Sequence, residues 1–184
     1  MSFRRNATLQ PEEEINWNQV DASLQKAMNE LRTASYLMHH PRLRTRHLHS
    51  FLRQYIVGFA DRSGLNIEIK ANPKIDQVPL SLQRILFRII QDALGNVYRH
   101  ASASQVSVQI RWIAEQVHIV ITDDGGGVER RGLHPSMRLR GIGERVKEYA
   151  GKLRIVRVRP NGARFHAAIP ASIVPRKRST SRAR

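Results

Sequence analysis

The hydrophobic pattern of residues 80–100 constrains the fold of this chain more than any other feature. A repeat of this length predicts one long amphipathic helix with a buried face. Such a helix needs an apolar surface to cover, so the rest of the chain has to supply a sheet or further helices. The apolar stripe consists of Leu82, Ile85, Leu86, Ile89, Ile90, Ala93, Leu94 and Val97.

Alternating apolar and polar residues predict several short strands elsewhere in the chain. Pro160-Asn161-Gly162 predicts a hairpin turn, and Gly64 predicts the end of a helix. The predicted strands are residues 65–70, 105–113, 116–122, 153–158 and 163–169, and the other predicted helices are residues 20–38, opening near Pro11, 45–62 and 142–150.

The order of these elements indicates the fold class. Strands that follow one another without a crossover favour antiparallel pairing, and the helices must then cover one face. We therefore expect an α+β two-layer sandwich with a mixed, mainly antiparallel sheet, preceded by a helical stem. The expected regions are a flexible N-terminus (1–16), a helical stem (17–62), a folded domain (63–171) and a basic disordered tail (172–184).

Composition excludes several classes of protein. The chain has no cysteine, which excludes disulfides and thiolate metal sites, and it has no long apolar run that predicts a membrane span. We therefore expect a cytoplasmic protein. The net charge of +16 suggests nucleic acid as a partner. Aromatic residues make up only 6% of the chain and fall mostly on apolar stripes, so nucleic-acid binding ranks last among the functions considered.

Polar residues gather on the face of the predicted long helix that lies off its apolar stripe. Asp92 and Asn96 are four residues apart on this face, and Arg99 and His100 follow one turn later. A carboxylate and an amide oxygen placed in this way can hold a hard cation or orient a water molecule. Polar residues on the outer face of a helix are more often simply solvated, so the pattern alone does not decide.

Two glycine-rich segments follow. Asp123 to Gly127 (DDGGG) comes directly after a predicted strand, and its glycines permit a close approach of the backbone to a ligand. An ordinary Asp-Gly turn is the equally weighted alternative. Gly141 and Gly143 lead into the predicted helix 142–150, where free amides favour phosphate, although a flexible loop explains them equally well.

In this order and spacing, the segments resemble the catalytic ATP-binding domain of sensor histidine kinases, within the Bergerat-type (GHKL) ATPases and the nitrate-sensor-like and degradative-enzyme-sensor-like subfamily. The resemblance covers residues 31–170 and includes SYLMHHPRL and FLRQYIVGFADRSGLNIEI upstream. Four segments carry it: LFRIIQDALGNVYRHA (86–101) resembles the N-box, TDDGGGV (122–128) the G1 box, RGIGERVKEYAGKL (140–153) the Gly-Met-x-Glu-Arg stretch and NGARFHAAIP (161–170) the closing strand.

The resemblance implies a Bergerat-type ATP fold and assigns roles to individual residues. Asn96 would bind Mg²⁺, and Asp123 would bind the adenine amine of ATP. Asp92 stands where the subfamily usually has the glutamate that activates or orients the attacking group. The remaining implied nucleotide-binding residues are Arg99, His100, Gly125, Gly127, Gly141 and Gly143.

The sequence departs from the family pattern in four places. None of its eight histidines is followed by Asp or Glu, so the expected phosphoacceptor motif is missing. Asp92 is one methylene shorter than glutamate, which predicts weaker catalysis. The glycines of the G2 box fall on Ser136 and Arg138. The acidic pair and glycine of the family stem fall on Arg44, Thr45 and His47.

Three functions are considered, and a different ATPase of the same superfamily, such as an anti-sigma serine kinase, is a further alternative that the upstream resemblance to sensor kinases disfavours. The first is an ATP-dependent phosphotransferase acting on a histidine supplied in trans by a kinase or phosphotransfer protein, with a response regulator downstream. The second is a degenerate member that regulates a kinase or response regulator by protein–protein interaction. The third, nucleic-acid binding, ranks last. The stem helices also predict a homodimer.

Overall fold

The computed structural model describes residues 17–38, 47–126 and 137–172, and the side chains of 137–140 are not among those described. These residues form four α-helices, a short 3-10 helix and a five-stranded sheet. The helices are α1 (Trp17–Met38), α2 (Leu48–Ser63), α3 (Leu80–His100) and α4 (Met137–Glu148), with the 3-10 helix η1 (Pro73–Gln77). The strands are β1 (Asn66–Ala71), β2 (Gln105–Ile113), β3 (Gln116–Asp123), β4 (Lys152–Arg157) and β5 (Ala163–Pro170).

The sheet is mixed and open, with the strand order β1-β2-β3-β5-β4. β1 pairs with β2 in parallel because α3 carries the chain back between them, and the other three pairings are antiparallel. The expected α+β class with a mixed, mainly antiparallel sheet is therefore confirmed.

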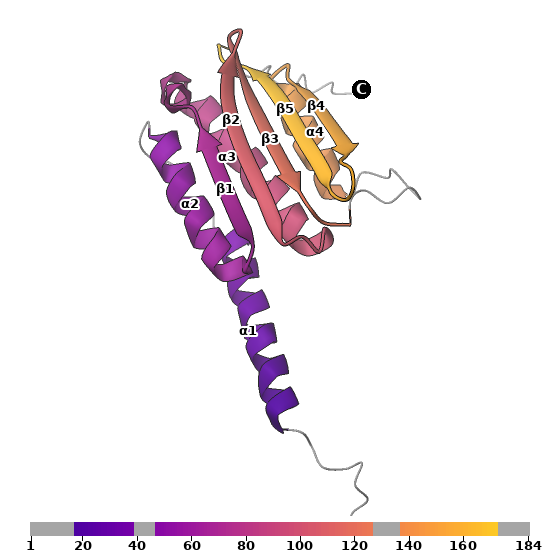
Figure 1. The fold of residues 1–184 in the computed structure, drawn as a ribbon. Coiled ribbons are helices and arrows are strands. Elements are labelled where there is room, and N and C mark those ends of the chain that lie inside the picture. The colour runs from indigo at the N-terminus through magenta and orange to yellow at the C-terminus, as the bar shows by residue number, and fades with distance from the viewer. Residues whose placement is uncertain (1–16, 39–46, 127–136, 173–184) are drawn as a thin grey trace, which may run out of the picture.

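One face of the sheet is apolar and is covered by helices (Figure 1). Strand alternation directs every second residue of β2 and β3 into the core, and Ile110 lies directly opposite Ile119 in the register. The buried stripe of α3, which includes Leu82, Leu86 and Ile90, packs against this surface. Leu48 and Phe59 of α2 belong to the same core, so α2 packs together with α3 and the sheet.

The predicted elements agree closely with the observed ones for α3 and β2, whose bounds are those predicted. The loop expected around Pro73 contains η1. Helix α4 begins at Met137, five residues before the predicted start at residue 142, and this difference matters for the site. The predicted helix opening near Pro11 and the N- and C-terminal segments 1–16 and 173–184 lie outside the described residues.

Helix α1 projects from the rest of the molecule (Figure 1). Only Thr33 and Leu37, in its C-terminal half, are buried. An exposed apolar stripe runs along it at heptad spacing, with Trp17, Val20, Leu24, Leu31 and Met38 between 47% and 76% exposed. Among the described helices, none is long and apolar enough to cross a membrane. The boundary predicted between a stem (17–62) and a folded domain (63–171) remains a prediction.

Candidate functional site

Asn96 is the most unusual polar residue of helix α3. Its side-chain atoms Oδ1 and Nδ2 are both buried, and neither has a hydrogen-bond partner among the described residues. A buried amide without partners costs about 1–3 kcal/mol, so such a group is retained where a ligand or an ion completes its bonding. Asn96 is therefore the residue around which a candidate site can be built.

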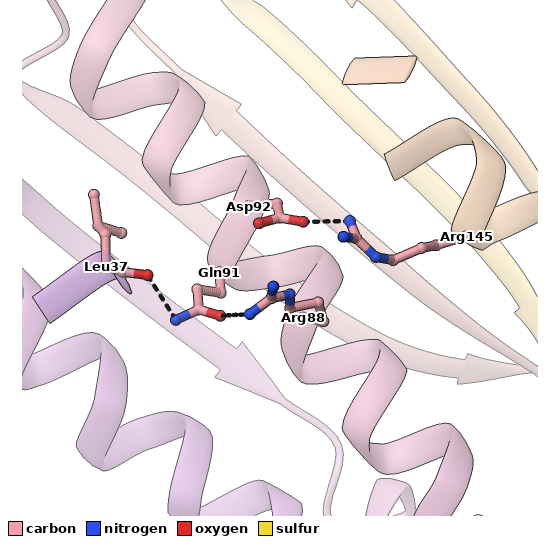
Figure 2. A network of polar contacts seen from close by, with 5 residues as sticks. All are labelled: Leu37, Arg88, Gln91, Asp92 and Arg145. Carbon is pink, nitrogen blue, oxygen red and sulfur yellow. Dashed lines mark hydrogen bonds and ion pairs between the residues drawn. The ribbon is translucent and has the colours of Figure 1, made fainter. Parts of the chain in front are cut away.

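Asp92, one turn before Asn96, forms an ion pair with Arg145 of α4 (Figure 2). Arg145 Nη1 lies 2.5 Å from Asp92 Oδ2, and each side chain is about a third exposed. The pair joins α3 to α4 and places a guanidinium against the carboxylate to which the family resemblance assigns a catalytic role. The sequence gives no local signal for a role of Arg145, because 53 residues separate it from Asp92.

Asp123 closes strand β3 with its side chain buried. Its Oδ1 accepts hydrogen bonds from the backbone N–H groups of Gly125, at 3.0 Å, and Ala163, at 3.3 Å. Burial raises the pKa of this carboxyl, and the two backbone hydrogen bonds oppose that rise. Both of these bonds use Oδ1, so Oδ2 is the atom suited to accept a hydrogen bond from a ligand amine.

Gly125 lies against the C-terminal end of α3. A Cβ added at this position would lie 2.1 Å from the carbonyl oxygen of Ala101, a distance that no side chain tolerates. The next amide, the N–H of Gly126, donates a hydrogen bond of 2.8 Å to the same oxygen. The space that glycine provides here is filled by the protein's own backbone, and the contact fixes the loop after β3 to the end of α3.

Asp124 ties this loop to the start of β2. Its Oδ1 accepts the backbone N–H groups of Ser104 and Gln105, both at 2.8 Å, and its Oδ2 accepts the Ser104 hydroxyl at 2.6 Å. These three bonds favour the carboxylate and lower the pKa of Asp124 to about 2. Asp124 thus holds the loop in place, while its neighbour Asp123 faces inward.

The hairpin between β4 and β5 contributes a contact that the sequence analysis missed. Gly162 has a φ of +113°, and a Cβ added to it would lie 1.9 Å from the carbonyl oxygen of Asp123. The sequence pattern predicted a hairpin turn at Gly162 but carried no signal for the contact with Asp123. Gly162 allows this approach, and it brings the N–H of Ala163 within reach of the Asp123 carboxylate.

The structure corrects the prediction for Gly141 and Gly143. Because α4 begins at Met137, both glycines lie inside the helix, beyond the first four amides that a helix leaves unpaired. They therefore do not offer the free helix-start amides that the sequence pattern predicted. Gly127, Ser136, Arg44 and Thr45 lie outside the described residues, as does the side chain of Arg138.

Arg99 and His100 lie exposed in the last turn of α3. The Arg99 guanidinium folds back along the helix, since a Cβ added at Gly95 would lie 2.7 Å from its Nη2. The positive charge of Arg99 interacts favourably with the negative end of the helix dipole at the C-terminus of α3.

The residues of the candidate site lie on three elements. Asp92 and Asn96 come from the C-terminal half of α3, Asp123 comes from the end of β3, and Arg145 comes from α4. Asn96 supplies one amide oxygen of the kind that hard cations prefer. The described residues contain no cluster of three or more acidic or histidine side chains that could hold a metal ion. A cation at Asn96 would therefore need further ligands from a bound molecule or from water.

The sequence profile described as "Histidine kinase-, DNA gyrase B-, and HSP90-like ATPase" matches residues 81–173. The chain is 33% identical over 121 residues to the signal transduction histidine-protein kinase/phosphatase DegS of Brevibacillus brevis, a match that covers 65% of this chain and 31% of that protein. It is 36% identical over 103 residues to the histidine-protein kinase/phosphatase UhpB of Salmonella typhimurium, covering 55% of this chain and 20% of that protein. The chain thus spans about a third or less of the length of these relatives.

Solved structures of histidine kinases have the same fold. The histidine kinase domain of the blue-light activated kinase EL346 from Erythrobacter litoralis superposes with a TM-score of 0.61 at 16% identity, covering 78% of this chain and 74% of that domain. The mycobacterial sensor histidine kinase MprB gives a TM-score of 0.53 at 18% identity, covering 70% and 97%. At this level of identity the likeness concerns the fold alone.

Proposed function

Because the chain belongs to the family of histidine kinase-, DNA gyrase B- and HSP90-like ATPases, we propose that it binds ATP with Mg²⁺ as the catalytic domain of a two-component sensor histidine kinase. The observation that carries this proposal is the buried and unpartnered side chain of Asn96, at the position of the N-box asparagine. The buried carboxylate of Asp123, at the position of the G1-box aspartate, also supports it.

Each site residue has a proposed role. Asn96 Oδ1 binds Mg²⁺, and Asp123 Oδ2 accepts a hydrogen bond from the exocyclic amine of adenine. A bound Mg²⁺ would neutralise charge on the phosphates, which is the main requirement of phosphoryl transfer. Gly125 keeps the loop of Asp123 against α3. Phosphate contacts are proposed for Arg99, His100, Gly127, Gly141 and Gly143. The two glycines of α4, Gly141 and Gly143, would allow the phosphates to approach the helix backbone closely, but they would not donate free amides.

The proposed reaction moves the γ-phosphoryl group of ATP to an imidazole nitrogen of a histidine and releases ADP. The bond between the γ-phosphorus and its bridging oxygen breaks as the nitrogen–phosphorus bond forms. No histidine of this sequence is followed by an acidic residue, as the phosphoacceptor of the subfamily is. We therefore propose that the histidine is supplied in trans, with a response regulator as the later recipient.

The exposed stripe of α1 is the proposed surface for helical partners. Five apolar residues at heptad spacing are exposed to solvent, which is typical of a helix that packs against another helix. A second copy of the chain is the proposed occupant, as in a symmetric helical bundle.

One observation favours the second candidate function, a degenerate module that acts by protein–protein interaction. The Arg145 guanidinium forms an ion pair with the Asp92 carboxylate, so this side chain already has a partner within the protein. The retained Asn96 and Asp123 favour the kinase, because a module that had lost nucleotide binding has no need for a buried amide without partners.

The deciding experiment is a titration with a fluorescent ATP analogue, with and without Mg²⁺, beside an Asp123→Ala variant. Saturable, Mg²⁺-dependent binding that the variant loses is the expected result. An absence of binding at millimolar nucleotide would overturn the kinase proposal and leave the interaction module.

A further inference from the structure

Gln91 joins the end of α1 to the middle of α3. Its Nε2 donates a hydrogen bond of 3.0 Å to the backbone carbonyl of Leu37 (Figure 2). Both residues are buried, at 2% and 8% exposure. Its Oε1 accepts a hydrogen bond from Arg88 at 3.3 Å, so the side-chain amide is held from both ends.

The acceptor in this bond is a group that a helix cannot satisfy itself. Leu37 lies in the last turn of α1, where the final four carbonyls have no partner within the helix. Gln91 therefore acts as a C-terminal cap that comes from a different helix. Removing it would leave this buried carbonyl without a partner among the described residues, which is more costly than losing an exposed bond.

Two further polar contacts of α1 go to a different element. The Thr33 hydroxyl donates to the carbonyl of Arg62 at 2.8 Å, and the Tyr36 hydroxyl donates to the carbonyl of Tyr55 at 3.0 Å. Both acceptors belong to α2. These bonds attach α1 to α2, whereas Gln91 fixes it to α3.

Gln91 is followed directly by Asp92. Successive residues of an α-helix point about 100° apart, so the two neighbours face different partners. Gln91 faces the stem, and Asp92 faces Arg145 on α4 (Figure 2). Asn96 lies about one turn further along the same rigid helix. The orientation of α1 is thus set directly against the helix that carries the candidate site.

We propose that Gln91 is a positioning residue that fixes the direction of α1 relative to Asp92 and Asn96. The surface of α1 that a partner helix would use is thereby held at a fixed distance and angle from the nucleotide site. This inference rests on the proposed function. It assigns Gln91 to the geometry of phosphoryl transfer and not to nucleotide affinity.

The test measures the orientation of α1 directly. The chain has no cysteine, so the double variant Asn18→Cys and Lys152→Cys gives two unique spin-label sites, exposed on α1 and β4. The distance distribution between the labels is compared with and without Gln91→Met, which keeps the side-chain length and removes the donor. We expect a broader distribution in Gln91→Met. We also expect amide exchange of residues 33–38 to become roughly tenfold faster, as follows from about 1.4 kcal/mol for one unsatisfied buried carbonyl.

Gln83→Met is the matched control. Gln83 is a second buried glutamine of α3, but its Nε2 donates to the carbonyls of Asp76 and Val78, neither of which belongs to α1. It should lower the melting temperature by a similar amount and leave the spin-label distances unchanged. Arg88→Met, which leaves the bond to Leu37 in place, should also preserve them.

The inference is overturned if Gln91→Met keeps the wild-type distances, or if Gln83→Met broadens them equally. Titration of the same variants with Mg²⁺ and a non-hydrolysable ATP analogue keeps the two proposals apart. We expect Gln91→Met to bind the analogue within about threefold of wild type, since its side chain faces the stem. A failure of the wild-type protein to bind would contradict the proposed function, whereas the distance measurement would still decide the role of Gln91. A loss of binding confined to Gln91→Met would overturn its assignment to positioning.

Discussion

The backbone N–H of Ala163 donates a hydrogen bond to Asp123 Oδ1 across 40 residues of sequence. This bond brings the β4–β5 hairpin against the end of β3, where Gly162 alone leaves room for the approach. Together with the N–H of Gly125, it orients the Asp123 carboxyl group from one side. The geometry of this residue therefore depends on three segments of the chain, and it leads to the first prediction.

Asp123→Asn should weaken ATP binding without lowering the stability of the fold. The asparagine oxygen can keep both backbone hydrogen bonds, but an amide donor replaces the acceptor proposed for the adenine amine. We expect ATP affinity to fall about 10- to 100-fold, as for the loss of a hydrogen bond to a charged group. Isothermal titration calorimetry measures the affinity.

The same variant has an expected effect on stability. Because burial raises the pKa of Asp123 in the folded protein, its contribution to stability is lost as the pH rises through that pKa. Asparagine stays neutral, so Asp123→Asn should be as stable as wild type or more stable at pH 7 in thermal denaturation. A variant that is clearly less stable would contradict this assignment.

Gly125→Ala should destabilise the loop after β3. The added methyl would collide with the Ala101 carbonyl, so the backbone has to shift, at a cost of about 1–3 kcal/mol in the free energy of unfolding. Gly126→Ala is the control, because the nearest atom to its added Cβ lies 4.0 Å away. Chemical denaturation of both variants tests the difference, and equal stabilities would show that the contact with Ala101 is unimportant.

Asp124 should stabilise the fold down to an unusually low pH. Its folded pKa of about 2 lies below its ordinary value, so its contribution is complete above pH ~4 and is lost as the pH falls through about 2. Ser104→Ala removes one of the three hydrogen bonds and should raise this pKa. The carbon chemical shift of the Asp124 carboxyl, followed by NMR against pH, measures both values. A wild-type midpoint near pH 4 would contradict the observed hydrogen bonding.

Asp92→Asn should affect the chemistry more than the binding of nucleotide. The amide keeps the size of the side chain but cannot accept a proton or form the ion pair with Arg145. We expect ATP affinity within a few-fold of wild type and a rate of ADP release roughly 100-fold lower. Asp92→Glu restores the family's residue and should match or exceed the wild-type rate. If Asp92→Asn leaves the wild-type rate unchanged, Asp92 has no catalytic role.

The stripe of α1 should mediate self-association. Leu24 and Leu31 are 56% and 71% exposed and lie seven residues apart, so Leu24→Glu with Leu31→Glu places charge in the centre of the proposed seam. Light scattering should show a dimer for wild type and a monomer for this variant. Asn18→Glu with Gln25→Glu, on a neighbouring exposed face, is the control and should remain dimeric. A wild-type protein that stays monomeric at high concentration would exclude a second copy as the partner.

The sequence by itself determined most of the secondary structure, including the long helix that carries Asp92 and Asn96. The bounds of α3 and β2 were predictable because apolar periodicity reports which face of an element is buried, and this pattern is local. The same periodicity placed Asp92 and Asn96 on the polar side of α3. The start of α4 was not predictable, since polar residues carry no such pattern and glycines within the helix resembled a helix boundary.

The tertiary structure alone decided which partner each polar side chain meets. Asp92 meets Arg145 and Gln91 meets Leu37, across 53 and 54 residues of sequence. The close approach of Gly125 to Ala101 likewise depends on how the end of β3 stacks against α3. Contacts of this kind follow from the packing of whole elements, because a side chain bonds to whatever the fold brings within about 3 Å of it. Periodicity within one element reports its burial but not the neighbour that buries it.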